Sequence, residues 1–232
     1  MRTKGVIIFI LVILSGVFYY NYFTQEDFNK INVQRIIDGD TIEIENKQKV
    51  RLKGINVPEK NMPDYDTATN FLIKELENQT VQLEYSEKDR YGRLLGYLFV
   101  NKQNINMEVL SNGIGHLYYY EEDHYYEDLK QAEAYAQDNK LGIWKESPNS
   151  DCIELIELDY YDKEGENETL ILQNNCNKEI DVIIKDDATH IYKETIKKGS
   201  FTKNFKNIFN DDKDTLYLWD KDGKMILYHR YS

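Results

Sequence analysis

The chain has 232 residues, a length that suits two domains of ordinary size. Hydrophobic residues make up 41% of it, which excludes a wholly disordered or collagen-like protein. The formal net charge is −12, and both residues 33–147 and residues 148–232 are acidic. A generally positive surface for nucleic acid is therefore excluded, so any such function needs a locally basic site. With only two cysteines, a cysteine-based zinc framework is excluded as well.

The amino-terminal stretch from Gly5 to Phe23 contains no charged residue. As a helix it would be about 28 Å long, close to the hydrocarbon thickness of a bilayer. Arg2 and Lys4 precede it, which favours a cytoplasmic amino terminus and a body outside the cytoplasm. We therefore predict a single-pass transmembrane helix in the cell membrane at residues 5–23. A cleaved signal peptide, which would release a secreted protein, is the alternative.

Residues 24–32 are predicted to be a linker, and residues 33–147 a first folded domain. Apolar and polar residues alternate from Ile36 to Ile55 around a polar turn, which predicts a β-hairpin. Further strands are expected at Val81–Tyr85 and Leu94–Val100. Helical patterns cover Asp66–Asn78, Met107–Asn112 and Tyr125–Asn139. Short strands followed by helices indicate a small barrel with helices packed on one side.

Four residues of this domain have the chemistry for phosphodiester hydrolysis. Asp40 opens the hairpin in a carbonyl-rich turn that could hold a divalent cation. Arg51 and Arg93 could clamp a phosphate and oppose its developing negative charge. Glu59 could orient or deprotonate water. In a flat hairpin Asp40 and Arg51 would point to opposite faces, so barrel twist or a bulge would have to reorient one of them.

Five stretches in this order resemble the staphylococcal nuclease family, also called thermonucleases. They read IIDGDTIEI, VRLKGINVPE, DRYGRLLGYLFV, INMEVLSNGIG and LKQAEAYAQDNKLGIW. The resemblance covers residues 33–147 and implies an OB-type five-stranded barrel with three helices. It also implies a calcium-dependent endonuclease that hydrolyses DNA and RNA, and we expect it to prefer single strands.

The resemblance assigns roles to the candidate residues. Arg51 and Arg93 would bind and polarise the scissile phosphate, Glu59 would act on the attacking water, and Asp40 would be a calcium ligand. The family also implies contacts with a neighbouring phosphate and a base, which would fall to Arg90, Tyr91 and Tyr119. Stacking on Tyr119 would suit single strands.

The chain departs from the family at the end of the hairpin. The family often has aspartate and threonine there, where this chain has Asn56 and Val57. The Asn56 side-chain oxygen and the Val57 backbone carbonyl can still bind calcium, but they bring no charge, so we expect weaker binding. By this hypothesis Asn56→Asp would tighten it. The alternative is a non-catalytic envelope protein that binds nucleic acid or serves in adhesion; the intact Arg51, Glu59 and Arg93 favour the enzyme.

Residues 148–151 are predicted to be a second linker, and residues 152–232 a β-sandwich. Strands are expected at Cys152–Leu158, Glu168–Gln173, Ile180–Ile184, Thr189–Thr195, Thr215–Trp219 and Met225–Tyr228. The stretches LILQNNCNKEIDV, IKDDATHIY and DKDTLYLWDKDG resemble a lamin-tail-like domain. That resemblance implies an immunoglobulin-like sandwich that binds or tethers an unknown ligand.

Three further groups of residues have side chains of a kind that can form a metal site or a disulfide. Asp211, Asp212, Asp214, Asp220 and Asp222 are expected to be solvated turn residues rather than a calcium cluster. The four histidines have no metal-ligand spacing and are expected to be surface or packing residues. Cys152 and Cys176 could form a disulfide if the body is exported, or remain two free thiols.

Overall fold

The computed structural model describes residues 29–119, 122–160 and 168–231. The predicted transmembrane helix at residues 5–23 lies outside these ranges. Within them, no helix has the length and apolar character needed to cross a membrane.

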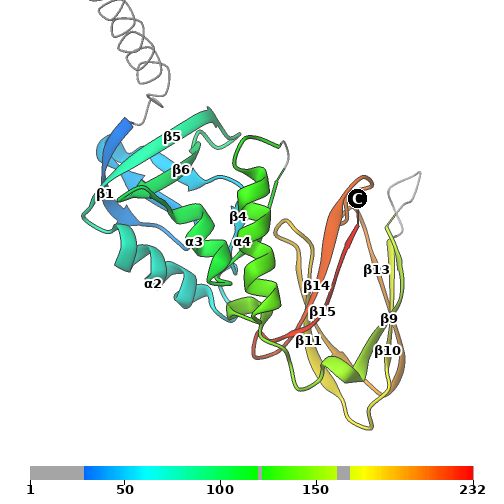
Figure 1. The fold of residues 1–232 in the computed structure, drawn as a ribbon. Helices are drawn as coiled ribbons and strands as arrows, with labels where there is room; N and C mark the ends of the chain where they lie inside the picture. The colour runs from blue at the N-terminus through cyan, green and yellow to red at the C-terminus, as the bar shows by residue number, and fades with distance from the viewer. Residues whose placement is uncertain (1–28, 120–121, 161–167, 232) are drawn as a thin grey trace, which may run out of the picture.

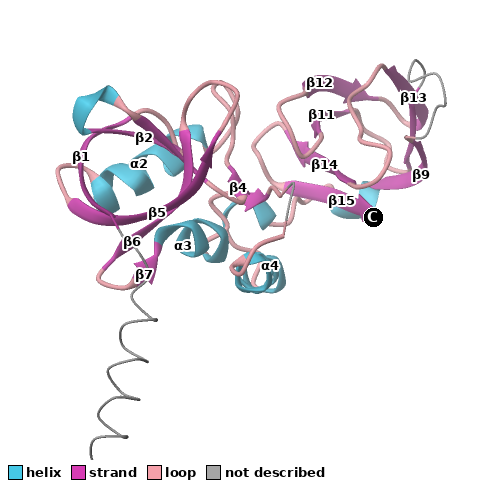
Figure 2. Ribbon diagram, turned by 90° about the horizontal axis from the view of Figure 1, so that it is seen from above, coloured by secondary structure: helices cyan, strands magenta, loops and turns pink. Residues whose placement is uncertain are grey.

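The first domain is a closed five-stranded barrel, which confirms the OB-like prediction (Figure 2). Its strands are β1 (Asn29–Ile36), β2 (Thr41–Ile44), β3 (Lys49–Leu52), β5 (Thr80–Lys88) and β6 (Leu94–Val100). They pair in the order β3-β2-β1-β5-β6, and a parallel pairing of β3 with β6 closes the ring. β1 starts at Asn29, inside the predicted linker, because residues 29–32 pair with β5.

Three helices stand within two residues of their predicted positions: α2 (Tyr65–Leu76), α3 (Ile105–Ser111) and α4 (Tyr126–Asp138). Helix α2 buries Ala68, Leu72 and Leu76, which are four residues apart and so share one face. Two short pieces complete this domain: β7 (Gln103–Asn104) beside β6, and β4 (Ile55–Asn56) paired with β8 (His116–Leu117).

Two sheets enclose a second core in the described part of the carboxyl-terminal half (Figure 1). One sheet has the order β13-β10-β9, from Gly199–Phe205, Glu168–Asn174 and Ile153–Asp159. The other has the order β12-β11-β14-β15, from Ile191–Ile196, Ile180–Lys185, Asp214–Asp220 and Met225–Tyr231. β13 was not predicted, because its alternating Phe201 and Phe205 are separated by polar residues and give a weak signal.

Cys152 and Cys176 form a disulfide, which resolves the alternative left open by the sequence. It ties the start of β9 to the turn after β10 across a separation of 24 residues. We expect reduction of this bond to lower the free energy of unfolding by about 3 kcal/mol, since a loop of this size then regains its freedom in the unfolded chain. Urea unfolding with and without reductant measures this, and alkylation followed by mass measurement verifies the redox state. Equal unfolding curves would contradict the expectation.

The two domains share an apolar interface beside α4 (Figure 1). The cluster consists of Ala136, Ile143 and Trp144 from the first domain and Ile183, Tyr217, Trp219 and Met225 from the second. The backbone also crosses it: Met225 donates to the Lys145 carbonyl at 2.7 Å, and Ser147 donates to the Met225 carbonyl at 2.8 Å. Residues 145–147, which precede the predicted linker, are therefore held by backbone hydrogen bonds against Met225 at the start of β15.

Candidate active site

The turn Asp38–Gly39–Asp40 is packed directly on α2. A Cβ atom on Gly39 would lie 2.5 Å from the Cβ of Ala68, so only glycine fits this approach. The Asp40 amide donates to Asp38 Oδ1 at 3.1 Å, and this contact fixes the turn. The motif is thus held in place by helix packing as well as by its own hydrogen bond.

Asp40 and Arg51 are adjacent. Arg51 Nη1 lies 2.6 Å from Asp40 Oδ2, and Nη2 donates to the side-chain oxygen of Asn56. Thr41 pairs with Arg51 across β2 and β3, but Asp40 lies one residue before β2. The turn therefore sets the direction of the Asp40 side chain. The alternation of a flat hairpin, which would point Asp40 and Arg51 to opposite faces, does not extend to residue 40. One guanidinium therefore joins two of the predicted metal ligands.

Glu59 is half-buried close to this group. Burial raises the pKa of its carboxyl group, and the negative charge of Asp40 raises it further. The positive charges that lower this pKa are, in decreasing order, those of Lys185, Arg51 and Arg93. Lys185 comes from β11 of the second domain and was not among the sequence candidates.

Arg93 follows the turn between β5 and β6. Its Nε donates to Asp89 Oδ2 at 2.6 Å, and its backbone amide donates to Asp89 Oδ1 at 2.9 Å. The guanidinium groups of Arg90 and Arg93 lie 4.9 Å and 5.5 Å from the centre of the Tyr91 ring, which is 69% exposed. The structure thus places the three predicted residues on one exposed turn that Asp89 stabilises.

Tyr119 belongs to a hydrogen-bonded network with Tyr97 and Asp123. Its hydroxyl is 2.8 Å from that of Tyr97, which also donates to Asp123. Its ring packs 5.1 Å from that of Tyr126, and burial raises the pKa of its hydroxyl. Base stacking by Tyr119 stays a prediction.

The oxygen atoms near Arg51 have the chemistry that a hard divalent cation requires. Asp38 and Asp40 repel each other: burial, and then the charge of Asp40, raise the pKa of Asp38 to about 6. A cation there would relieve the repulsion, and the Asn56 oxygen and the Val57 carbonyl could complete the set. Among the described residues, no group of three or more histidine, cysteine, aspartate or glutamate side chains is arranged to hold a metal ion.

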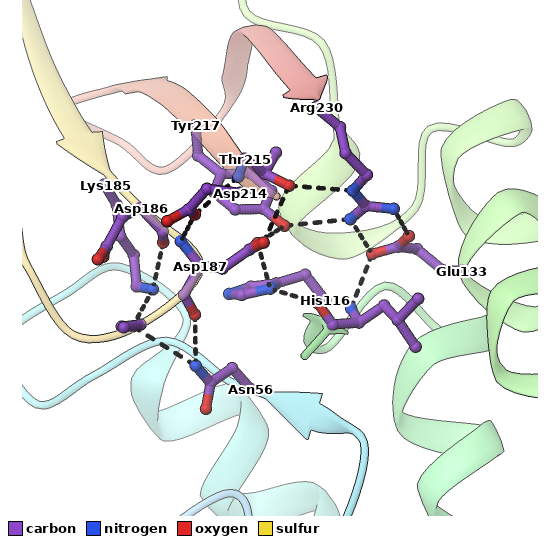
Figure 3. Close-up of polar contacts among 12 residues, drawn as sticks. Asn56, His116, Glu133, Lys185, Asp186, Asp187, Asp214, Thr215, Tyr217 and Arg230 are labelled. Carbon is purple, nitrogen blue, oxygen red and sulfur yellow. Dashed lines mark hydrogen bonds and ion pairs between the residues drawn. The ribbon is translucent and has the colours of Figure 1, made fainter. Parts of the chain in front are cut away.

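A polar network from the second domain reaches this site (Figure 3). Asn56 Nδ2 donates to the Asp187 carbonyl at 2.6 Å and lies 3.4 Å from that of Ala188. Asp187 follows β11, and its carboxylate accepts from the Tyr217 hydroxyl at 2.9 Å. His116, beside Asn56 in the β4–β8 pair, is buried against the Tyr217 ring. In the sequence, the residues around Asp187 form part of the stretch IKDDATHIY, which indicates only a β-sandwich. No sequence pattern indicated that this loop contacts Asn56.

Two acidic residues differ from expectation. Asp214 and Asp220 are buried, so the prediction that they are solvated is wrong for both. Asp214 accepts hydrogen bonds from the backbone amides of Asp187, Asn210 and Thr215. Asp220 accepts from the Ser147 hydroxyl at 2.6 Å, across the interface. Protein N–H and O–H donors replace the water that each carboxylate loses on burial, so both side chains can be buried.

This barrel brings arginines, a half-buried carboxylate and side-chain oxygen atoms into one region, which are groups that phosphodiester hydrolysis requires. The family model for staphylococcal nuclease homologues matches residues 49–146. The thermonuclease of Staphylococcus hyicus is 32% identical over 163 residues, covering 61% of this chain and 96% of the relative. That of Staphylococcus intermedius is 33% identical, covering 62% and 97%. Endonuclease YncB of Bacillus subtilis (strain 168) is 31% identical over 137 residues, covering 53% and 65%. The chain belongs to the staphylococcal nuclease family.

Proposed function

We propose that the chain is an exported, membrane-anchored, calcium-dependent nuclease that hydrolyses DNA and RNA and prefers single strands. The observation that carries the proposal is the contact of Arg51 with both Asp40 and Asn56, close to Glu59. These groups provide phosphate binding, oxygen ligands and a base in one place. The thermonuclease relatives support the same activity.

The side chains divide the chemistry among them. Arg51 and Arg93 bind the scissile phosphate and stabilise the negative charge that grows on it. Glu59 orients the attacking water and accepts its proton, and its raised pKa makes it a stronger base than an exposed glutamate. Calcium, held by Asp40, Asn56 Oδ1 and the Val57 carbonyl, would supply positive charge next to the phosphate. Arg90, Tyr91 and Tyr119 contact the flanking nucleotides.

Two features support export and anchoring. Residues 5–23 are apolar and follow two basic residues. The Cys152–Cys176 disulfide suits an oxidising compartment outside the cytoplasm. If the apolar segment is cleaved, the same body would be secreted. The resemblance of residues 152–232 to lamin-tail-like domains supports a further binding or tethering role for a ligand that is unknown.

The test follows degradation of a single-stranded DNA by the full chain, kept in mild detergent because of residues 5–23. We expect degradation with added calcium, none with a chelator, and a loss of about 10²–10³-fold in Arg93→Ala. Arg35→Ala is the matched control, because Arg35 is an exposed arginine of β1 whose contact is with Glu43. A duplex of the same sequence, cut more slowly, would support the preference for single strands. Intact substrate under every condition, with folded protein, would move the barrel to the class of binding domains.

A further inference from the structure

Asn56 joins the two domains through a single side chain. It is 3% exposed, and its oxygen accepts from Arg51 while its nitrogen donates to the Asp187 carbonyl. The assignment of the two ends is unambiguous, because a guanidinium can only donate and a backbone carbonyl can only accept. The orientation of the amide is therefore set jointly by the barrel and by the second domain.

The loop that contacts Asn56, residues 186–190, is called here the docking loop. Lys185, 1% exposed, precedes it and donates through Nζ to the carbonyls of Asp186 and Ala188. The Asp186 carboxylate accepts from the backbone amide of His190 at 3.0 Å and contacts its ring nitrogen at 2.7 Å. The loop is thus fixed by its own contacts, with its carbonyls directed at Asn56 (Figure 3).

The amide at position 56 fits the docking loop, whereas a carboxylate would not. Aspartate there would place an anionic oxygen 2.6 Å from the Asp187 carbonyl oxygen, where Asn56 now donates a hydrogen bond. The departure from the aspartate of the family pattern thus has a structural cause in this chain.

We propose that the second domain holds the nuclease site in its working geometry by orienting the Asn56 amide, with Lys185 as the positioning residue that supports this contact. The docking loop keeps the Asn56 oxygen on Arg51, and Lys185 maintains the docking loop. This inference rests on the proposed nuclease function and adds to it that the second domain is a working part of the site.

The test compares full-chain variants by kcat and KM on single-stranded DNA at saturating calcium. We expect Asn56→Asp and Lys185→Met each to lower kcat about tenfold with little change in KM. The double variant should also fall only about tenfold, because both changes break one connection. Lys193→Met is the matched control: Lys193 also crosses the interface, to the Asn61 carbonyl at 3.2 Å, and should leave kcat unchanged.

Tryptophan fluorescence gives an independent readout. Trp144 and Trp219 are the two tryptophans of the chain, and both lie in the interface cluster. We expect unchanged emission in Asn56→Asp, with the domains still docked while kcat falls. Emission shifted to the red along with lower activity would mean domain separation, and would overturn a positioning role.

Other results would also overturn the inference. Unchanged or higher kcat in Asn56→Asp would mean that the carboxylate acts only as a better calcium ligand. An approximately hundredfold loss in the double variant would mean two independent effects. If Lys185→Met does not fold, Asn56→Asp decides alone. A wild-type protein that cuts nothing would refute the proposed function instead, so the two failures can be told apart.

Discussion

Arg51→Ala should lower kcat on single-stranded DNA by about 10³-fold. The change removes a charged donor from the phosphate site, and it also releases Asp40 and Asn56, which Arg51 holds together. Steady-state kinetics at saturating calcium measures the loss, and circular dichroism verifies that the variant is folded. A further substitution, Arg51→Lys, should recover little, because one ammonium cannot reproduce the two-ended contact of the guanidinium.

Arg35→Ala provides the control for Arg51→Ala. Arg35 lies on β1 of the same barrel, but its ion pair with Glu43 is largely exposed at the arginine end. The substitution Arg35→Ala should change kcat by less than about twofold. Similar losses in the two variants would show a general effect of charge on substrate attraction, and would contradict a specific role of Arg51.

Arg230→Ala should lower the free energy of unfolding by about 2 kcal/mol. Arg230, on β15, donates to both oxygens of Glu133 at 2.7 Å and 3.2 Å, which joins the second domain to α4. Glu133 is 1% exposed and also accepts from the backbone amide of Leu117 at 2.7 Å. In Arg230→Ala the buried Glu133 carboxylate keeps only its hydrogen bond from the Leu117 amide. The loss should stay below the range for fully buried pairs, because Arg230 is partly exposed and water can replace it.

Urea unfolding of the full chain measures the effect of Arg230→Ala. Lys197→Ala is the control, since Lys197 and its partner Glu179 are exposed and 3.8 Å apart. It should change the free energy of unfolding by less than about 0.5 kcal/mol. Equal values for the two variants would contradict a structural role for the Arg230–Glu133 pair.

The local pattern of the sequence was enough to predict most elements of the fold. β6 has the predicted bounds, and the three helices lie within two residues of theirs, because each of these elements packs apolar side chains against a buried core. β13 was missed where polar residues obscure the alternation. The interface cluster was also missed, because its residues come from segments that pattern alone assigns to two separate cores.

For the candidate site, the sequence alone determined the chemistry of one domain: the Asp-Gly-Asp turn, the arginines and Glu59, in an order typical of the family. Only the tertiary structure decided how these groups meet. The packing of Gly39 against Ala68 directs Asp40 toward Arg51, which alternation along a strand could not indicate. The contact of Asn56 with Asp187 spans 131 residues and depends on how two domains dock. Such a contact follows from the shapes of two folded surfaces, and no local pattern of residues encodes it.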